Sequence, residues 1–193
     1  MKVGIFIYDN AEVLDFSGPF EVFSTAERIS SEQRFTTFLI SEKAGLVTAR
    51  AGYQVKSNYG IDEHPTLDVL IIAGGVHYEQ ITNMPVIEWI AEQSKQVKII
   101  ASVCTGAFLL AQAQVITDQK VTTHWDDIDD LRCLFPALDV IEDTRWVEQG
   151  NIVTSAGISA GIDMSLHLVE RIYDKHLADN TAKQMEFDRT LVE

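Results

Sequence analysis

Cys104 is the side chain in this sequence best suited to chemistry. An apolar run typical of a buried strand stops at this cysteine in IIASVCTGAFLLA and turns at once into small residues and a helical pattern. Such a strand–cysteine–helix turn is typical of a nucleophile elbow, which exposes a reactive side chain at the end of a sheet. The N–H groups and positive dipole end of the following helix would favour the thiolate. The alternative is that Cys104 is a small buried hydrophobe, as most free cysteines are. Cys133, beside leucines in LRCLFP, is expected to have a structural role.

A cysteine nucleophile needs a partner that holds or moves protons, and Asp15 is the first candidate. It lies in VLDFSGPFEVF, just after the first predicted strand and between two apolar residues. Capping of a helix start is the simpler explanation. If Asp15 is partly desolvated beside a thiolate, its pKa should rise, which suits a general acid. Glu21 is the second candidate, although its helical position is also typical of a solvated face.

Three further positions could contact a substrate. Gly74 and Gly75 end a buried apolar run and could turn backbone N–H groups toward an oxyanion, or form an ordinary turn. Thr105, beside the sulfur, could bind substrate or cap the helix. His124, in KVTTHWDD, could pair with the thiol or be held by Asp126 as a structural element. Separation in sequence does not show whether its ring reaches the sulfur.

Spacing gives no sign of a metal or a nucleotide site. The remaining histidines show no metal-ligand spacing with one another or with the cysteines; they are His64, His77, His167 and His176. The sequence also has no glycine-rich phosphate loop. We therefore expect neither a metal nor another cofactor.

Composition narrows the class of protein. The chain has 193 residues, of which 46% are hydrophobic and 23% charged, so one domain over residues 1–193 is the simplest organisation. A net charge of −14 argues against nucleic acid and anionic membranes as partners. The N-terminus does not resemble a signal peptide, and no apolar stretch approaches the roughly 20 residues of a membrane span. We expect a cytoplasmic protein with reduced thiols.

The predicted elements alternate between strands and helices. Strands are expected at residues 3–8, 35–40, 67–73, 97–103 and 120–123, with hairpins at 47–57 and 146–155. Helices are expected from Gly18-Pro19 onward and at residues 85–96, 105–113, 158–173 and 178–189. Continuous apolar strands predict a mostly parallel sheet covered by helices. Residues 9–19, 74–80 and 104–106 would then lie at the carboxyl ends of strands, where such folds hold their chemistry.

Five segments in order resemble the PfpI/ThiJ superfamily, which has the class I glutamine amidotransferase-like fold. They are VLDFSGPFEVF, DVLIIAGG, SVCTGAFLLAQA, TTHW and SAGISAGIDMSLHLVERI, and they span nearly the whole chain. The resemblance implies a flavodoxin-like three-layer α/β sandwich and a homodimer. It makes Cys104 the nucleophile and Asp15 its acidic partner, with Gly75 and Thr105 near the thiolate. It places Ile158 on the active-site edge of the long helix in the C-terminal half.

Within that superfamily the sequence looks most like isonitrile hydratases and the sensor-like domains of some transcription regulators. The expected reaction is hydration of a small isonitrile to an N-substituted formamide through a Cys104 thioimidate, with Asp15 as general acid and base. Thr105 stands where the protease-like branch has histidine, and Asp15 appears in place of the glutamate of the glyoxalase- and deglycase-like branch. The alternatives are amidase, peptidase or glyoxalase-like chemistry at the same thiol, and a non-catalytic redox or metabolite sensor. Regulators of this type append a helix-turn-helix domain that this sequence lacks, so no DNA-binding role is expected.

Overall fold

A seven-stranded sheet runs through the computed structural model, which describes residues 1–190. Its strands are β1 (Lys2–Phe6), β2 (Thr36–Ser41), β5 (Tyr59–Gly60), β6 (Val69–Ile72), β7 (Ile99–Val103), β10 (Trp146–Gln149) and β11 (Ile152–Ser155). They lie in the order β10-β11-β7-β6-β1-β2-β5. All neighbours pair in parallel except β10 and β11, which form an antiparallel hairpin. The predicted α/β fold with a mostly parallel central sheet is confirmed.

The central strands explain why the apolar runs of the sequence are continuous. Every residue of β6 and β7 is buried, as are four of the five residues of β1. A strand covered on both faces has no solvent side, so polar residues do not alternate along it. The buried apolar side chains form one connected core that extends from Val3 to Ala182.

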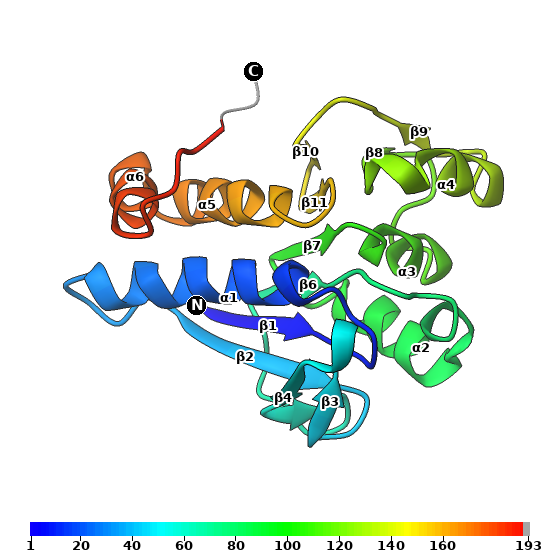
Figure 1. Ribbon diagram of the computed structural model, residues 1–193, viewed down its shortest axis with the longest axis horizontal. Helices are drawn as coiled ribbons and strands as arrows, with labels where there is room; N and C mark the ends of the chain where they lie inside the picture. Colours follow the sequence, from blue (N-terminus) through cyan, green and yellow to red (C-terminus); the bar gives the residue numbers. More distant parts are fainter. Residues whose placement is uncertain (191–193) are drawn as a thin grey trace.

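Helices cover the sheet in two groups. They are α1 (Val13–Ile29), α2 (Met84–Gln93), α3 (Gly106–Gln112), α4 (Ile128–Leu134), α5 (Ala160–Ile172) and α6 (Lys175–Gln184). Helices α1, α5 and α6 contact one another, whereas α2 contacts α3 away from that group (Figure 1). The ring of Trp89 on α2 lies 5.4 Å from that of Phe6 on β1, so aromatic packing ties α2 to the sheet.

The first helix begins at Val13 and not at Gly18-Pro19, so that prediction was wrong. Pro19 lies inside α1, where it leaves the carbonyl four residues earlier without its helical partner. Tertiary packing outweighs this cost, because Gly18 and Pro19 are buried and a Cβ at Gly18 would lie 3.0 Å from Ile162 of α5. The earlier start places Asp15 in the first turn of α1.

Several short elements complete the chain. The hairpin of β3 (Leu46–Thr48) and β4 (Gln54–Lys56) was predicted, and so was a strand at β8 (Lys120–Val121). Helix α4 and strand β9 (Asp139–Val140), which pairs in parallel with β8, were missed. Short 3-10 turns are η1 (Arg50–Gly52), η2 (Gln80–Thr82) and η3 (Trp125–Asp127). Helix α6 begins earlier than predicted, because the Asp174 side chain caps it by accepting from the Leu177 N–H at 2.8 Å. It also ends earlier than predicted, at Gln184.

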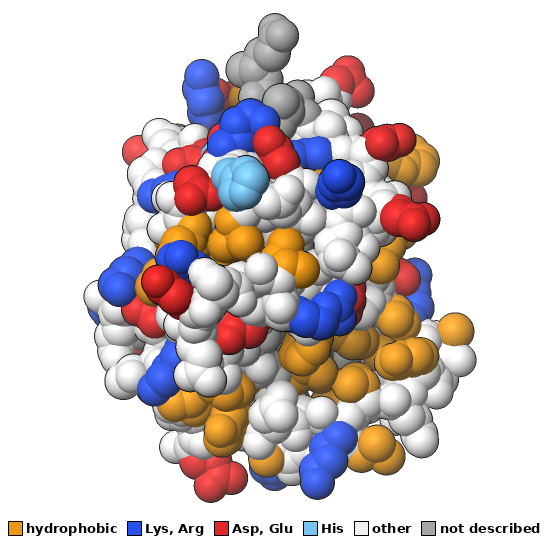
Figure 2. Space-filling model, turned by 90° about the vertical axis from the view of Figure 1, so that its left-hand side faces the viewer, with side chains coloured by type: hydrophobic (Ala, Val, Ile, Leu, Met, Phe, Trp, Pro, Cys, Tyr) orange, Lys and Arg blue, Asp and Glu red, His pale blue; other side chains and the backbone are white. Residues whose placement is uncertain are grey.

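The surface has a mixed character where it is displayed. Figure 2 shows the face that lies at the left of Figure 1, with basic and acidic side chains intermingled and hydrophobic areas between them. Over the part of the chain that the structure describes, no helix is long and apolar enough to cross a membrane.

Candidate active site

The predicted loops meet where the direction of the sheet connections reverses. From β1 the chain continues to β2 on one side, whereas β6, on the other side of β1, leads outward to β7 and β11. In open α/β sheets, ligands bind at the carboxyl ends of the strands beside such a reversal. Asp15, Gly74 and Cys104 follow β1, β6 and β7 and lie together there. A Cβ built on Gly74 would lie 2.7 Å from Asp15 Oδ2 and 2.8 Å from Cys104 Cβ.

Cys104 has the backbone of a nucleophile elbow. Its φ is 55°, a left-handed value that side-chain-bearing residues rarely adopt and that costs about 1–3 kcal/mol. Hydrogen bonds hold it: its N–H donates to Ser155 O at 3.2 Å, and its carbonyl accepts from Thr123 Oγ1 at 2.8 Å. A Cβ at Gly106 would lie 2.3 Å from Ile72 O, so only glycine lets α3 approach β6 this closely. The turn thus fixes the sulfur at the sheet edge.

Asp15 is a buried carboxyl without a cationic partner in the described part of the chain. Its exposed fraction is 0%, and its Oδ2 accepts from the Gly74 N–H at 3.2 Å. Its Oδ1 makes no hydrogen bond of ordinary geometry within residues 1–190. Burial, followed by the charge of Glu12, raises the pKa of Asp15 to about 7, although the Gly74 N–H and the Cys104 thiol act in the opposite direction. A carboxyl with this pKa can both give and take a proton at neutral pH.

The Cys104 thiol is not the low-pKa group that the helix-dipole argument predicted. Burial raises its pKa well above the ordinary value, and the negative charge of Asp15 raises it further, while the Thr105 N–H acts in the opposite direction. Helix α3 has only seven residues, and the N–H groups at its N-terminus stabilise the thiolate less than burial and the Asp15 carboxylate destabilise it. Two acids this strongly coupled lose their protons as a pair. Transfer of the thiol proton to Asp15 would remove the charge that opposes the thiolate.

Gly75 and Thr105 bind each other reciprocally. The Gly75 N–H donates to Thr105 Oγ1 at 2.8 Å, and that hydroxyl donates to the Gly75 carbonyl at 2.9 Å. Gly75 has φ 137°, and a Cβ there would lie 2.4 Å from Asn10 O. Because the Gly74 and Gly75 N–H groups already have partners, an oxyanion role for them would require these bonds to exchange. That role stays a prediction.

His124 lies at the rim and is held by Asp127. Its Nδ1 lies 3.4 Å from Asp127 Oδ2, to which it donates when this nitrogen carries a proton, and it accepts from the Asp126 N–H at 3.3 Å when it does not. The carboxylate that fixes the ring is therefore that of Asp127, and Asp126 contributes only its backbone. The His124 ring packs closely against Gly157, since a Cβ built on that glycine would lie 2.0 Å from His124 Cδ2. No hydrogen bond joins His124 to Cys104 within the described residues.

Ile158 occupies the opposite rim, just before α5. It is another non-glycine residue in the left-handed region, with φ 55°, and its side chain is 39% exposed. Its backbone N–H lies close enough to Asp15 to lower the pKa of that carboxyl. The strained backbone at Ile158 and the strained backbone at Cys104 thus flank the same acid.

A cleft of about 730 Å³ opens beside the elbow. Its walls include Thr123 and Ala156, whose oxygens lie within hydrogen-bond distance of the Cys104 backbone, together with His124 and the rim residue Ile158. Trp125 stands over the opening with 76% of its surface exposed. Cys104 and Asp15 are not among the lining residues, so the cleft borders the elbow through groups that contact the Cys104 backbone.

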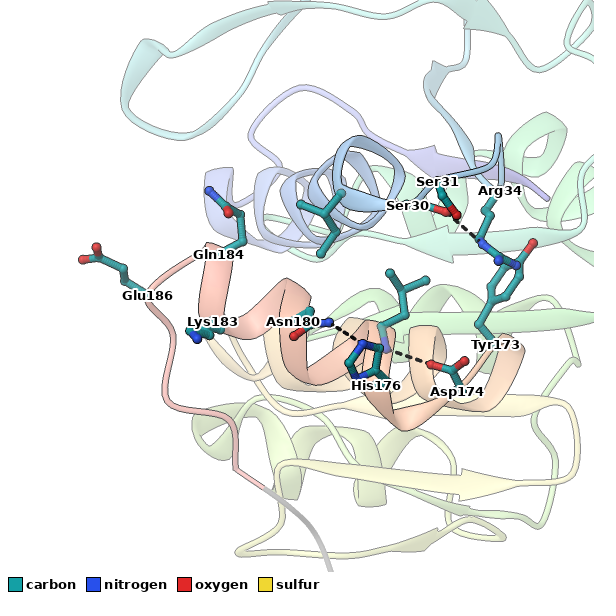
Figure 3. Close-up of a pocket in the computed structure, with 12 residues that line it drawn as sticks. Ser30, Ser31, Arg34, Tyr173, Asp174, His176, Asn180, Lys183, Gln184 and Glu186 are labelled. Atoms are coloured by element: carbon teal, nitrogen blue, oxygen red, sulfur yellow. Dashed lines mark hydrogen bonds between the residues drawn. The ribbon is translucent and has the colours of Figure 1, made fainter.

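A second hollow, of about 650 Å³, lies between the end of α1 and α6 (Figure 3). Its polar groups face one another: Arg34 lies 4.2 Å above the Tyr173 ring, and Asn180 is 3.0 Å from the His176 imidazole. It contains none of the sequence-predicted site residues. Its position away from the reversal point of the sheet gives it no part in chemistry at Cys104.

Three residues near the site were missed in the sequence. Tyr8 is buried just beyond β1, His77 stacks on Phe108 with ring centroids 4.4 Å apart, and Asp127 faces both His77 and His124. Burial lowers the pKa of His77 and raises that of Asp127. Tyr8 lies at the carboxyl end of β1, a position that could have marked it. Within residues 1–190, no three His, Cys, Asp or Glu side chains gather as metal ligands would.

The comparison with protein families agrees with this arrangement. Residues 1–171 match the model of the DJ-1/PfpI family. This chain belongs to the DJ-1/PfpI family. Isonitrile hydratase of Pseudomonas putida is 28% identical over 97% of this chain and 78% of its own length. A deglycase of Pyrococcus furiosus, PfpI, is 27% identical over 60% of this chain and 74% of its own length.

Other members of the DJ-1/PfpI family similar to this chain are regulators. The HTH-type transcriptional regulator GbdR of Pseudomonas aeruginosa is 24% identical over 97% of this chain, which spans 51% of that protein. Among solved structures, a ThiJ/PfpI family protein from Pseudomonas syringae superposes with a TM-score of 0.87 at 25% identity, over 100% of this chain and 77% of that one. The family thus includes enzymes and regulator domains on one fold.

Proposed function

We propose that this DJ-1/PfpI protein hydrates a small isonitrile to an N-substituted formamide. The observation that carries the proposal is the buried Cys104 thiol on a strained elbow beside Asp15, whose pKa of about 7 suits proton transfer in both directions. The similarity to isonitrile hydratase over 97% of the chain supports the choice of substrate class. We also propose a homodimer, from the family resemblance, and a cytoplasmic protein without nucleic acid or membrane partners, from the net charge of −14 and the character of the N-terminus.

The first half of the reaction makes a thioimidate. The Cys104 thiol gives its proton to the Asp15 carboxylate, and the thiolate attacks the terminal isonitrile carbon. That carbon then takes the proton from Asp15, so the adduct is R–N=CH–S–Cys104 and Asp15 is again ionised. The carboxyl serves as base and then as acid for one proton, which requires a pKa close to neutral.

The second half releases the formamide. Asp15 takes a proton from a water molecule while the water oxygen attacks the thioimidate carbon. Asp15 then gives that proton to the thioimidate nitrogen. The resulting adduct, R–NH–CH(OH)–S–Cys104, then loses the Cys104 sulfur. The proton of its hydroxyl group passes through Asp15 to that sulfur. The products are R–NH–CHO and the free thiol, so one water is consumed and no oxidant or reductant is needed. The cleft beside Thr123 and Ile158 is the proposed entry for the isonitrile.

Turnover of para-nitrophenyl isocyanide tests the proposal. We expect formamide to accumulate with wild type and with Cys133→Ala, since Cys133 is exposed on α4 and lies outside the elbow segment and the lining of the cleft. Cys104→Ala should abolish turnover. Full activity of Cys104→Ala would contradict the mechanism. No turnover by wild type would contradict the substrate class.

Sensing is the second candidate, because regulators align with 97% of this chain. In that case the cleft would bind a metabolite, or Cys104 would be oxidised, without turnover. Peroxide-dependent modification of Cys104 together with no consumption of isonitrile or methylglyoxal would favour the sensor. Methylglyoxal consumption alone would favour deglycase- or glyoxalase-like chemistry at the same thiol.

A further inference from the structure

Thr123 has a buried hydroxyl that binds the backbone of the elbow. The residue follows β8 by two positions, and only 1% of its surface is exposed. Its Oγ1 donates to the Cys104 carbonyl at 2.8 Å, although 19 residues separate the two in the sequence. The Ala107 N–H, at 3.3 Å, is a second donor to the same carbonyl. The shorter of these two bonds therefore comes from a side chain outside the elbow.

This bond restrains a residue that has an unfavourable backbone conformation. Cys104 has φ 55°, and a residue with a side chain keeps such a value only where its surroundings impose it. The Cys104 N–H donates to Ser155 O at 3.2 Å, which restrains one side of the residue. The Thr123 hydroxyl restrains the other side, at the peptide that joins Cys104 to Thr105.

The same peptide carries the Thr105 N–H on its opposite edge. A trans peptide is planar, so this N–H points away from the Cys104 carbonyl and from the hydroxyl that holds it. A Cβ built on Gly74 would lie 2.6 Å from the Thr105 nitrogen. The same point lies 2.7 Å from Asp15 Oδ2 and 2.8 Å from Cys104 Cβ, so the nitrogen lies among the reacting groups. The Thr105 N–H also opposes the rise in the pKa of the Cys104 thiol, as a donor to a thiolate does.

We propose that Thr123 is a positioning residue, whose hydroxyl anchors the Cys104 carbonyl and thereby keeps the Thr105 N–H aimed at the Cys104 sulfur. In nucleophile elbows the N–H of the residue after the nucleophile is a stabilising donor. An aligned donor stabilises the thiolate before attack and again as the sulfur leaves, without reorganising during the reaction. Without the anchor the strained peptide can rotate, and the donor loses its alignment. The effect on turnover rests on the proposed function, whereas the effect on the thiol does not.

Removal of the Thr123 hydroxyl leaves the charges around the sulfur in place, because valine has the shape of threonine and no polar group. The titratable and charged groups that face the reacting pair are Asp15 and Glu12 from the N-terminal end of α1, Arg50 beside Glu12, Tyr8 beyond β1, and Asp127 from η3, with His77 and His124 beside Asp127. A change in the reactivity of Cys104 would therefore report the lost anchor.

The first test measures the rate of Cys104 alkylation at pH 7 in a Cys133→Ala background. We expect Thr123→Val to slow the reaction with iodoacetamide about 10-fold, since one misaligned donor to a thiolate corresponds to about one pKa unit. Thr123→Ser keeps the hydroxyl and should stay within about twofold of the unsubstituted background. The matched control is Thr181→Val, because the Thr181 side chain is also buried and its hydroxyl donates to the Leu177 carbonyl of α6 at 2.7 Å. This control should react at the unsubstituted rate.

Three results of this test would overturn the proposal. The first is an unchanged rate in Thr123→Val. The second is an equal loss in Thr123→Ser, which would assign the effect to packing of the methyl group. The third is a loss with N-ethylmaleimide but not with the smaller iodoacetamide, which would indicate narrowed access to the sulfur. If Thr123→Val does not fold, Thr123→Ala and Thr123→Ser give the same comparison, since they differ by one oxygen.

Turnover of isonitrile and stability separate the remaining outcomes. We expect Thr123→Val to lower kcat about 10-fold and to change KM less than about twofold. A rise in KM at unchanged kcat would make Thr123 a substrate contact, and a lower urea midpoint with unchanged alkylation and kcat would make its hydroxyl structural; either result would overturn the proposal. Slower alkylation of Thr123→Val without turnover by wild type would support the anchor and contradict the substrate class.

Discussion

Asp15 and Asp163 are two aspartates with the same burial and different surroundings. Both have an exposed fraction of 0%, and they lie on helices α1 and α5, which pack together. Asp163 accepts from Arg145 Nε at 2.8 Å and from the Thr190 N–H at 2.8 Å. Asp15 accepts from the Gly74 N–H at 3.2 Å, the Ile158 N–H lies nearby, and its Oδ1 makes no hydrogen bond of ordinary geometry in residues 1–190.

These different surroundings show which of the two buried aspartates is available for proton transfer. A guanidinium beside a carboxylate stabilises the charged form and fixes its geometry. A carboxyl with no cation beside it is destabilised as an anion, and its pKa rises toward neutrality. Asp163 thus joins α5 to the segment before β10, whereas Asp15 keeps a proton that it can exchange.

The largest expected effect is on turnover when Asp15 becomes Asn. The amide keeps the size of the carboxyl but cannot take the thiol proton, so we expect kcat with isonitrile to fall about 10²–10⁴-fold. Steady-state kinetics measure this, with Asp163→Asn as the matched buried control. If Asp163→Asn lost activity and Asp15→Asn kept it, the assignment of proton transfer to Asp15 would be wrong.

The next effect is on stability as a function of pH. Because the pKa of Asp15 is raised from 3.8 to about 7, its stabilising contribution is fully present below pH 3.8 and is lost as the pH rises toward 7. The total change is up to roughly 4 kcal/mol between these limits. Urea unfolding from pH 4 to pH 8 measures it. Asp15→Asn should remove this part of the slope, and an unchanged slope would contradict the assignment.

A smaller loss of stability is expected for Asp163→Asn. The substitution leaves the Arg145 guanidinium without its buried partner, but one third of the Arg145 side chain is exposed and water can compensate in part. We expect the free energy of unfolding to fall by roughly 2 kcal/mol. Urea midpoints at pH 7 would show this, and a midpoint equal to wild type would mean that the ion pair gives no net stability.

The smallest expected effect concerns Glu12. The charge of Glu12 is the second cause, after burial, that raises the pKa of Asp15. The ion pair of Glu12 with Arg50, at 3.5 Å, already reduces the effect of that charge on Asp15. Glu12→Gln should therefore lower the midpoint of the rise in kcat with pH by about half a unit. A pH–rate profile beside that of wild type measures the shift, and an upward shift would contradict the sign.

Much of the fold could be predicted because buried strands are recognisable locally. The run at β6 is apolar throughout and the run at β7 is interrupted only by Ser102, as expected of strands in a sheet covered on both faces. Helix α4 was missed because acidic residues surround its only two buried side chains, Ile128 and Leu131. The start of α1 was misplaced because proline is a good first residue of a helix, and only packing against α5 shows that Pro19 is internal.

The candidate site was predictable in its residues and not in its electrostatics. The turn at Cys104 could be predicted from the sequence alone, because an apolar strand followed by small residues and a helix is typical of a nucleophile elbow. The sequence also placed Asp15 at the same edge of the sheet. Only folding brings Asp163 to Arg145, whereas Asp15 has no ion-pair partner within residues 1–190. Charge interactions depend on distance and burial in space, which residues far apart in the sequence acquire only when the chain folds.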